Sequence, residues 1–165
     1  KFPDIPVVAA GGIATGQGII STLSLGADAA TMGTRFIASL ECGVSNEYKM
    51  AVVKAGMEDI VLSERISGTA NSIISTPFAK KIGLKPNLLE KFILNNSVTK
   101  KYFRMLTQKR GMKMLEKSII PGNYQNLWIA GQSAELIDTI KSCDEIIENL
   151  KSETNNSFEK IKKLF

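Results

Sequence analysis

The chain has 165 residues, of which 44% are hydrophobic, and it carries a formal net charge of +5. This length and composition are typical of one globular domain with a core of its own, and the apolar runs are too short for a transmembrane helix. The basic residues are dispersed and mixed with Glu, which predicts a solvated surface rather than a nucleic-acid interface. We therefore expect a cytoplasmic protein that binds neither nucleic acid nor a membrane.

The sequence contains two cysteines, Cys42 and Cys143, and no histidine. The cysteines lack the close spacing of a zinc site, so we expect reduced thiols and no bound metal. Without histidine the chain lacks the commonest acid–base side chain near neutral pH, and imidazole chemistry would have to come from outside it. The chain enters a strand pattern almost at once, at Ile5, without an initiating Met. This predicts that the true N-terminus lies upstream.

A strand, a helix and a second strand are predicted in direct succession near the start. Residues 5–10 form a short continuous apolar run, as in a parallel strand that is buried on both faces. Apolar residues recur at helical spacing over 16–25, and Gly26 follows at the C-terminal cap position. A second short strand is predicted over 28–32. This order indicates a βαβ crossover in an α/β fold.

The pattern beyond this unit is mainly helical. The predicted elements are, in chain order, a helix over 46–55 capped by Ser45, extended pieces over 60–63 and 72–75, a helix entered at Thr76-Pro77, two or three helices over 86–117, a turn at 121–123 and a final helix over 133–150. The tail from residue 152 is polar. We expect Tyr48 and Trp128 to serve packing rather than catalysis.

The strongest functional signal is a pair of glycine loops, Ala10-Gly11-Gly12-Ile13 and Met32-Gly33-Thr34. Glycines let main-chain N–H groups approach a phosphate closely, and the free N–H groups at a helix start carry partial positive charge. The Thr34 hydroxyl adds a donor. The loops after the last two strands of a (β/α)8 barrel commonly form such a phosphate site. The alternative is that Gly11-Gly12 ends a strand and Gly33 permits a bend.

Three segments carry a more specific signal: PVVAAGGIA at 6–14, MGTRF at 32–36 and WIAGQSA at 128–134. Together they closely resemble the nitronate monooxygenase family, formerly called 2-nitropropane dioxygenases. The resemblance implies the C-terminal portion of an FMN-binding (β/α)8 TIM barrel with a mostly helical insertion or lid region. The implied division is into the last barrel strands and helices with the FMN phosphate site (1–56), the insertion or lid (57–125), a barrel-packing helix (126–150) and a polar tail (151–165).

The resemblance also implies which residues contact the cofactor FMN. The family pattern carries over to the two glycine loops, at Gly11, Gly12, Thr31, Met32, Gly33 and Thr34. Arg35 is either a partner of the phosphate or part of a salt bridge that ties its loop to the barrel. Gln132, in the AGQ segment, is a further candidate.

The activity implied by the resemblance is FMN-dependent oxidation of alkyl nitronates with O2, which gives a carbonyl compound and nitrite. Family members usually employ a histidine base upstream of the Gly-Gly loop, so the catalytic residue is not in this chain. The implied partners are a small-molecule nitronate, O2 and the N-terminal half of the barrel, from the same gene or a separate chain. A homo-oligomer is also compatible with the sequence.

Three alternatives remain open from the sequence. One is a flavin-dependent enoyl-acyl-carrier-protein reductase on the same scaffold, which the MGTRF and AGQ segments do not distinguish. Another is a non-flavin barrel such as inosine-monophosphate dehydrogenase, whose Gly-Gly loop binds a nucleotide phosphate. The last is a folded remnant without activity.

Overall fold

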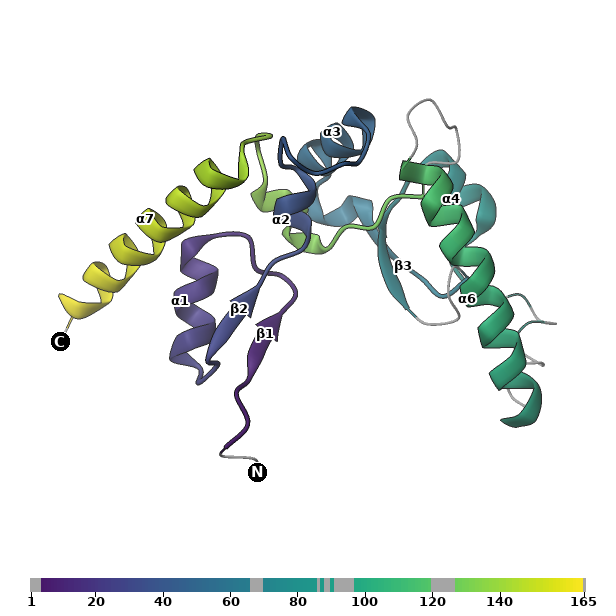
Figure 1. Cartoon of the computed structure of the whole chain (residues 1–165), viewed down its shortest axis with the longest axis horizontal. Helices are drawn as coiled ribbons and strands as arrows, with labels where there is room; N and C mark the ends of the chain where they lie inside the picture. Colours follow the sequence, from purple (N-terminus) through teal and green to yellow (C-terminus); the bar gives the residue numbers. More distant parts are fainter. Residues whose placement is uncertain are drawn as a thin grey trace.

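The computed structural model describes residues 4–65, 70–85, 87, 90, 97–119 and 127–164. In Figure 1 the helices α7 (Cys143–Lys162) and α6 (Ser97–Ile119) lie at opposite ends of the molecule, and α3 (Asn46–Lys54) lies between them. The described residues form two small sheets, one parallel and one antiparallel. This mixed helix and strand content confirms the α/β class expected from the sequence.

The predicted βαβ crossover is present. Strand β1 (Val8–Ala10) pairs in parallel with β2 (Ala29–Thr31), and α1 (Gly16–Ser24) connects them. The helix begins where the Thr15 hydroxyl accepts a hydrogen bond from the Gly18 N–H at 3.2 Å. It ends before Gly26, whose φ of 95° reverses the chain as the sequence suggested.

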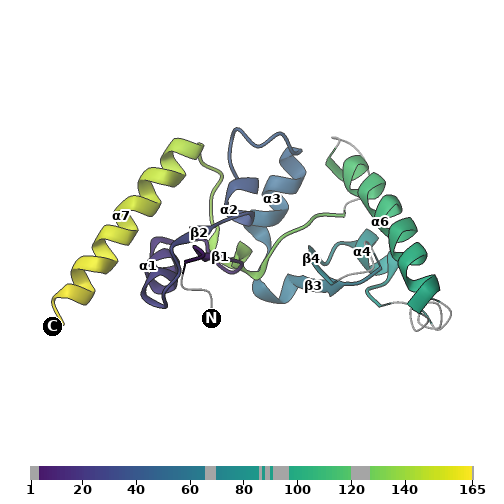
Figure 2. The ribbon, with the colours of Figure 1, turned by 60° about the horizontal axis from the view of Figure 1, so that its bottom comes forward.

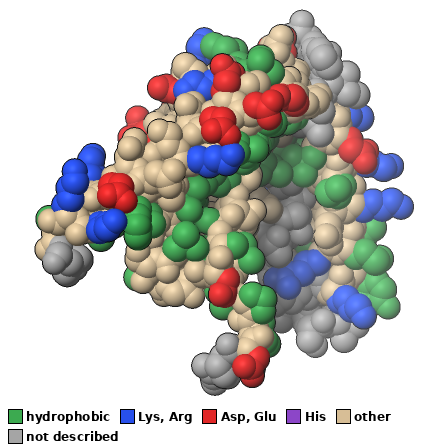
Figure 3. All heavy atoms as spheres, turned by 60° about the vertical axis from the view of Figure 1, so that its left-hand side comes forward, with side chains coloured by type: hydrophobic (Ala, Val, Ile, Leu, Met, Phe, Trp, Pro, Cys, Tyr) green, Lys and Arg blue, Asp and Glu red, His purple; other side chains and the backbone are tan. Residues whose placement is uncertain are grey.

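Strand β1 is shorter and more exposed than the sequence predicted. The expected strand over 5–10 was to be buried on both faces, but Ile5, Val7 and Val8 are 60%, 56% and 55% exposed. The physical reason is that β1 pairs with β2 alone among the described strands, and no described element covers its other flank. Figure 3 shows hydrophobic side chains gathered around the hollow of this face.

Helix α7 packs along α1, as Figures 1 and 2 both show. The approach is closest at Gly16, because a Cβ there would lie 2.4 Å from both the Glu153 Cβ and the Thr154 N. Only glycine therefore lets the two helices meet at this point. Nearer the start of α7, Ile146 is buried with 1% of its surface exposed.

The C-terminal elements differ from the prediction of one helix over 133–150 followed by a polar tail over 151–165. A short 3-10 helix, η2 (Gln132–Leu136), comes first. The chain then extends, and Lys141 forms a parallel bridge with Ser39. Ser142 starts α7 with a capping box, and the helix continues to Lys162 because no Gly or Pro interrupts it. Residues 151–162 of the predicted polar tail therefore form the second half of α7.

The largest core cluster lies where α3, η2 and α2 (Thr34–Ile37) meet. Ser45 caps α3 as predicted, accepting from the Tyr48 N–H at 3.3 Å. The side chains buried in this cluster include Ala38, Tyr48, Val52, Ile74, Trp128, Ala130, Ala134 and Ile137. This core fixes α2 against the segment that begins η2.

A second unit contains β3 (Ile60–Ser63), β4 (Asn71–Ile74) and α4 (Pro77–Ile82). The two strands pair antiparallel and match the predicted extended pieces to within one residue. Thr76 caps α4 with Pro77 at its first position, as predicted. Helix α6 packs on this unit through Met114 and Leu115.

Helix α6 accounts for one of the two or three helices expected over 86–117, and it runs on to Ile119. Residues 86, 88–89 and 91–96, and the turn expected at 121–123, lie outside the described residues. In the described part of the chain, no helix combines the length and the apolar character needed to cross a bilayer.

Candidate functional site

The sheet register brings the two glycine loops together. Ala10 is the partner of Thr31 in the parallel pair, so both strands end at the same edge. Gly11-Gly12 leaves this edge from β1, and Met32-Gly33 leaves it from β2. Of these residues Thr31 and Gly33 are exposed, and Met32 is half-buried. The sequence-predicted phosphate residues thus form one surface at the carboxyl ends of adjacent parallel strands, where ligands bind in α/β folds.

The Gly-Gly loop has a backbone that only glycine adopts readily. Gly11 and Gly12 have φ angles of 92° and 72°. A Cβ built on either residue would have no heavy atom within 4 Å. The loop therefore offers main-chain N–H groups beside open space rather than beside packed side chains. This is the arrangement that a bound anion requires.

A hydrogen bond joins two motifs that are far apart in the sequence. The Thr34 Oγ1 at the start of α2 accepts from the Gly131 N–H at 3.0 Å. Because that bond uses the oxygen as acceptor, the hydroxyl proton remains able to donate to a ligand. Gln132 follows Gly131 at the start of η2 and is exposed. The MGT and AGQ segments are therefore in direct contact.

Arg35 is bonded to the segment that follows η2. Its Nη1 donates to the Thr139 carbonyl at 3.0 Å, and its side chain is 7% exposed. Burial lowers the pKa of the Arg35 guanidinium, while the carboxylates of Asp138 and Glu153 oppose this shift. Arg35 thus ties α2 to the segment between η2 and α7. This position favours the tethering interpretation over contact with a phosphate.

The start of α1 already binds a carboxylate of this chain, that of Glu153. The Gly16 N–H donates to the Glu153 carboxylate at 2.7 Å, and the Thr15 hydroxyl accepts from Gly18. Sequence reasoning did not find Glu153, which lies 137 residues from Gly16 along the chain. The donors left for a ligand are those of the two loops and the Thr34 hydroxyl.

Tyr48 and Trp128 pack behind the site, as expected. Their rings stack with centroids 5.5 Å apart, and the Tyr48 hydroxyl donates to the Ile129 carbonyl at 2.5 Å. Burial raises the pKa of Tyr48 to about 12, so this hydroxyl keeps its proton at neutral pH. The pair holds the strand-like segment that leads into Gly131.

Two features of the chain bear on acid–base and metal chemistry. The sequence has no histidine. Among the described residues, no group of three or more Cys, Asp or Glu side chains could hold a metal ion. The residues gathered at the strand ends are suited to binding an anion.

Comparison with known proteins identifies the family. The family model described as nitronate monooxygenase matches residues 1–153. The chain belongs to the nitronate monooxygenase family. It is 32% identical over 154 residues to a probable nitronate monooxygenase of Staphylococcus saprophyticus, covering 92% of this chain and 39% of that protein.

Two further proteins that are similar to this chain carry different names. One is the (3aS,4S,5R,7aS)-5-hydroxy-7a-methyl-1-oxo-octahydro-1H-indene-4-carboxyl-CoA dehydrogenase of Mycobacterium tuberculosis, 26% identical over 172 residues, with 88% of this chain and 48% of that protein covered. The other is the structure of FabK from Thermotoga maritima, with a TM-score of 0.76, 34% identity, and 98% of this chain and 48% of that chain covered. The chain thus spans less than half the length of each of these relatives.

Proposed function

We propose that this chain forms the C-terminal portion of an FMN-binding (β/α)8 barrel and supplies its phosphate site. The observation that carries the proposal is the meeting of three family segments at one point: Gly11-Gly12 and Met32-Gly33 at adjacent strand ends, and Gly131 bonded to Thr34. Loops of this kind after neighbouring parallel strands commonly bind phosphate in such barrels. Family membership supports a flavin as the group that is bound.

The residues present fit the FMN phosphate. Gly11 and Gly12 have no Cβ, and the space beside them is open. Gly33 is equally open, with nothing within 4 Å of an added Cβ. The Thr34 hydroxyl supplies a side-chain donor whose oxygen is already fixed by Gly131. Thr31 and Met32 place this loop at the end of β2. The donor set is uncharged, so binding relies on several hydrogen bonds to a charged group.

The proposed reaction is oxidation of an alkyl nitronate to a carbonyl compound and nitrite. When bound, FMN supplies the redox chemistry, accepting electrons from the substrate and passing them to O2. The residues of this chain anchor and orient the cofactor through its phosphate. The base, a histidine in most family members, comes from the rest of the protein, because this chain has none.

The rest of the barrel is the proposed partner of the exposed β1 flank. The exposed apolar residues Ile5, Val7 and Val8 lie in or just before β1, whose second edge has no described neighbour. A (β/α)8 barrel surrounds every strand with two others, which would bury this flank. The chain alone is therefore expected to aggregate, to bind FMN weakly and not to turn over nitronates. Expressing it with and without the complementary half and measuring oligomeric state and flavin content tests this expectation.

A second candidate function has specific support. The identity to FabK, an enoyl-acyl-carrier-protein reductase, is 34% over nearly the whole chain. Another relative is named as a dehydrogenase of a carboxyl-CoA compound. On this alternative the protein reduces an enoyl thioester with a reduced nicotinamide cofactor. Membership of the nitronate monooxygenase family argues against the non-flavin barrel.

One pair of assays on the purified full-length protein separates the two candidates. Nitronate-dependent oxygen uptake supports the first function. Oxidation of NADH or NADPH that depends on a crotonyl thioester supports the second. If the protein binds no flavin and shows neither activity, the proposed function is wrong.

A further inference from the structure

A groove between α4 and α6 plays no part in the site described above. It has a volume of about 660 Å³, within the range of small-molecule sites. Its lining residues are Phe78, Lys81, Ile82, Leu106, Lys109, Arg110, Lys113, Met114 and Lys117. The apolar members form a floor, and the others are all cations.

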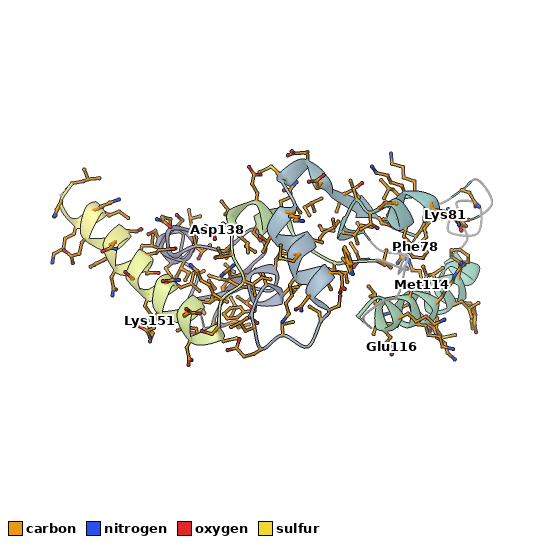
Figure 4. All side chains as sticks on the ribbon, turned by 90° about the horizontal axis from the view of Figure 1, so that it is seen from above. Phe78, Lys81, Met114, Glu116, Asp138 and Lys151 are labelled. Atoms are coloured by element: carbon orange, nitrogen blue, oxygen red, sulfur yellow. The ribbon has the colours of Figure 1, made fainter. Side chains whose placement is uncertain are left out.

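The lining residues of α6 form one continuous helical face. Positions 106, 109, 113 and 117, with their neighbours 110 and 114, recur every three or four residues, so they lie on the side of α6 that faces α4. In Figure 4, Phe78 and Lys81 of α4 lie across from Met114, whereas Glu116 projects from the other side of α6. The acidic side chain is thus outside the groove, and the cations are inside it.

The charge of the groove is one-sided. Of the nine described lining residues, five are Lys or Arg and none is Asp or Glu. Lys109, Lys113 and Lys117 follow one another at four-residue spacing, where like charges repel. Glu90 interacts with Arg110, but it is bound to Arg65 by a 3.0 Å ion pair. A polyanion in the groove would relieve this repulsion.

The shape and lining of the groove favour a nucleotide over other polyanions. A single aromatic side chain, Phe78, lies on its floor, which gives one base a surface on which to stack. A nucleic-acid strand would need several such surfaces, and a flat membrane would not reach a concave floor. The cations from Lys109 to Lys117 span eight residues of helix, about 12 Å at 1.5 Å per residue. That span suits several phosphates spread around one nucleoside.

We infer that this groove binds the 3′-phosphoadenosine diphosphate end of coenzyme A. The adenine packs on Phe78 and Met114, and the three phosphates lie among the Lys and Arg side chains. This inference deepens the second candidate function, since the thioester carrier is then coenzyme A, as in the name of the Mycobacterium tuberculosis relative. It assigns a binding role to a face of the molecule that is separate from the glycine loops.

Calorimetric titration of the purified flavin-loaded protein with free coenzyme A tests the inference. The groove variant Lys109→Ala/Lys113→Ala should weaken coenzyme A binding about tenfold or more, as expected for losing two charged partners. The control Lys101→Ala/Arg104→Ala removes the same charge from exposed positions on α6 that do not line the groove. It should change the affinity by less than about threefold. Alanine suits a helix interior, so both variants keep α6 intact.

Ligand variants identify the occupant. Dephospho-coenzyme A, which lacks the 3′-phosphate, should bind about fivefold more weakly, because one charged contact is lost. Equal loss in the groove and control variants would mean only long-range attraction and would overturn the inference. Tighter and equally groove-dependent binding of NADPH would also overturn it, because the occupant would then be a different nucleotide.

The outcome is separable from that of the proposed function. Coenzyme A binding is measured without turnover, so it can persist in a protein that is inactive in both assays. Conversely, oxygen uptake with a small nitronate does not need the groove. Absence of coenzyme A binding in a protein active on nitronates would refute the inference alone.

Discussion

Replacing Gly12 with Val gives the sharpest test of the phosphate site. At φ 72° a side chain strains the backbone by about 1–2 kcal/mol, even though the space around the position is open. The same substitution also places a branched side chain where the phosphate is proposed to lie. It should therefore lower stability moderately and lower flavin affinity much more.

Gly26→Val provides a matched control. Gly26 has a φ of 95° and equally open surroundings, but it ends α1 at the opposite edge from the loops. Its substitution should carry a similar strain of about 1–2 kcal/mol. Because Gly26 offers nothing to the phosphate, flavin content should remain near that of the unmodified protein.

The expected magnitude follows from the hydrogen bonds at stake. A bond to a charged group contributes about 1.5–3 kcal/mol, so losing one or two from the Gly11-Gly12 loop weakens FMN binding by about tenfold to about ten-thousandfold, at about 1.4 kcal/mol per factor of ten. The assay is the ratio of flavin absorbance to protein in the purified variants, with urea unfolding as the measure of stability. A Gly12→Val protein that purifies fully loaded with FMN would refute the assignment of this loop.

Three further predictions follow from single contacts. Thr34→Val should cost about 1.5–3 kcal/mol in flavin affinity and Thr34→Ser should cost little, as measured by flavin titration; equal losses would show that the hydroxyl is not the donor. Tyr48→Phe should lower the free energy of unfolding by about 1 kcal/mol, because the Ile129 carbonyl loses its donor while the ring stack persists; an unchanged urea midpoint would contradict this. The pKa of Glu41 is lowered chiefly by the Cys143 N–H, so its stabilisation is present above about pH 4.5 and is lost as the pH falls through the lower folded value. Glu41→Gln should therefore flatten the acid side of a plot of Tm against pH, and an unaltered slope would disprove that assignment.

Local signals in the sequence predicted the local structure well. The caps at Ser45 and Thr76 and the turn at Gly26 depend on residues within three positions of one another. The same holds for the glycine loops, whose spacing reflects one strand, one helix and the next strand. The sequence alone therefore predicts that the two glycine loops lie at the same edge of the sheet.

The final helix shows how a sound local pattern misleads. The apolar stripe read across 133–150 combined residues from two different environments. Ile137 belongs to the central core and is 2% exposed, whereas Ile147 lies on α7 and is 42% exposed. Ser142 and Glu145 mark the break through a capping box, a signal that the apolar periodicity obscured. Two segments with different partners thus resembled one helix.

The contacts that define the site could not be read from local patterns. The bond between Thr34 and Gly131 joins residues 97 positions apart, and that between Gly16 and Glu153 joins residues 137 apart. Periodicity and spacing carry no information on such pairs, because each depends on how α7 and η2 fold back onto the start of the chain. Family resemblance indicated that the MGT and AGQ segments matter but not that they touch.

The Glu153 contact bears on whether a phosphate would bind at the start of α1 or at the glycine loops. A helix start attracts an anion by about 0.3–1 kcal/mol at an exposed position. A second anion brought within about 4 Å of the Glu153 carboxylate would be repelled by about 4 kcal/mol at an effective dielectric constant of about 20. Repulsion therefore exceeds the attraction of the α1 start, which already holds Glu153 at Gly16. A phosphate bound as proposed would therefore lie toward the loop N–H groups and Thr34, so that the glycines rather than a helix dipole carry the proposed site.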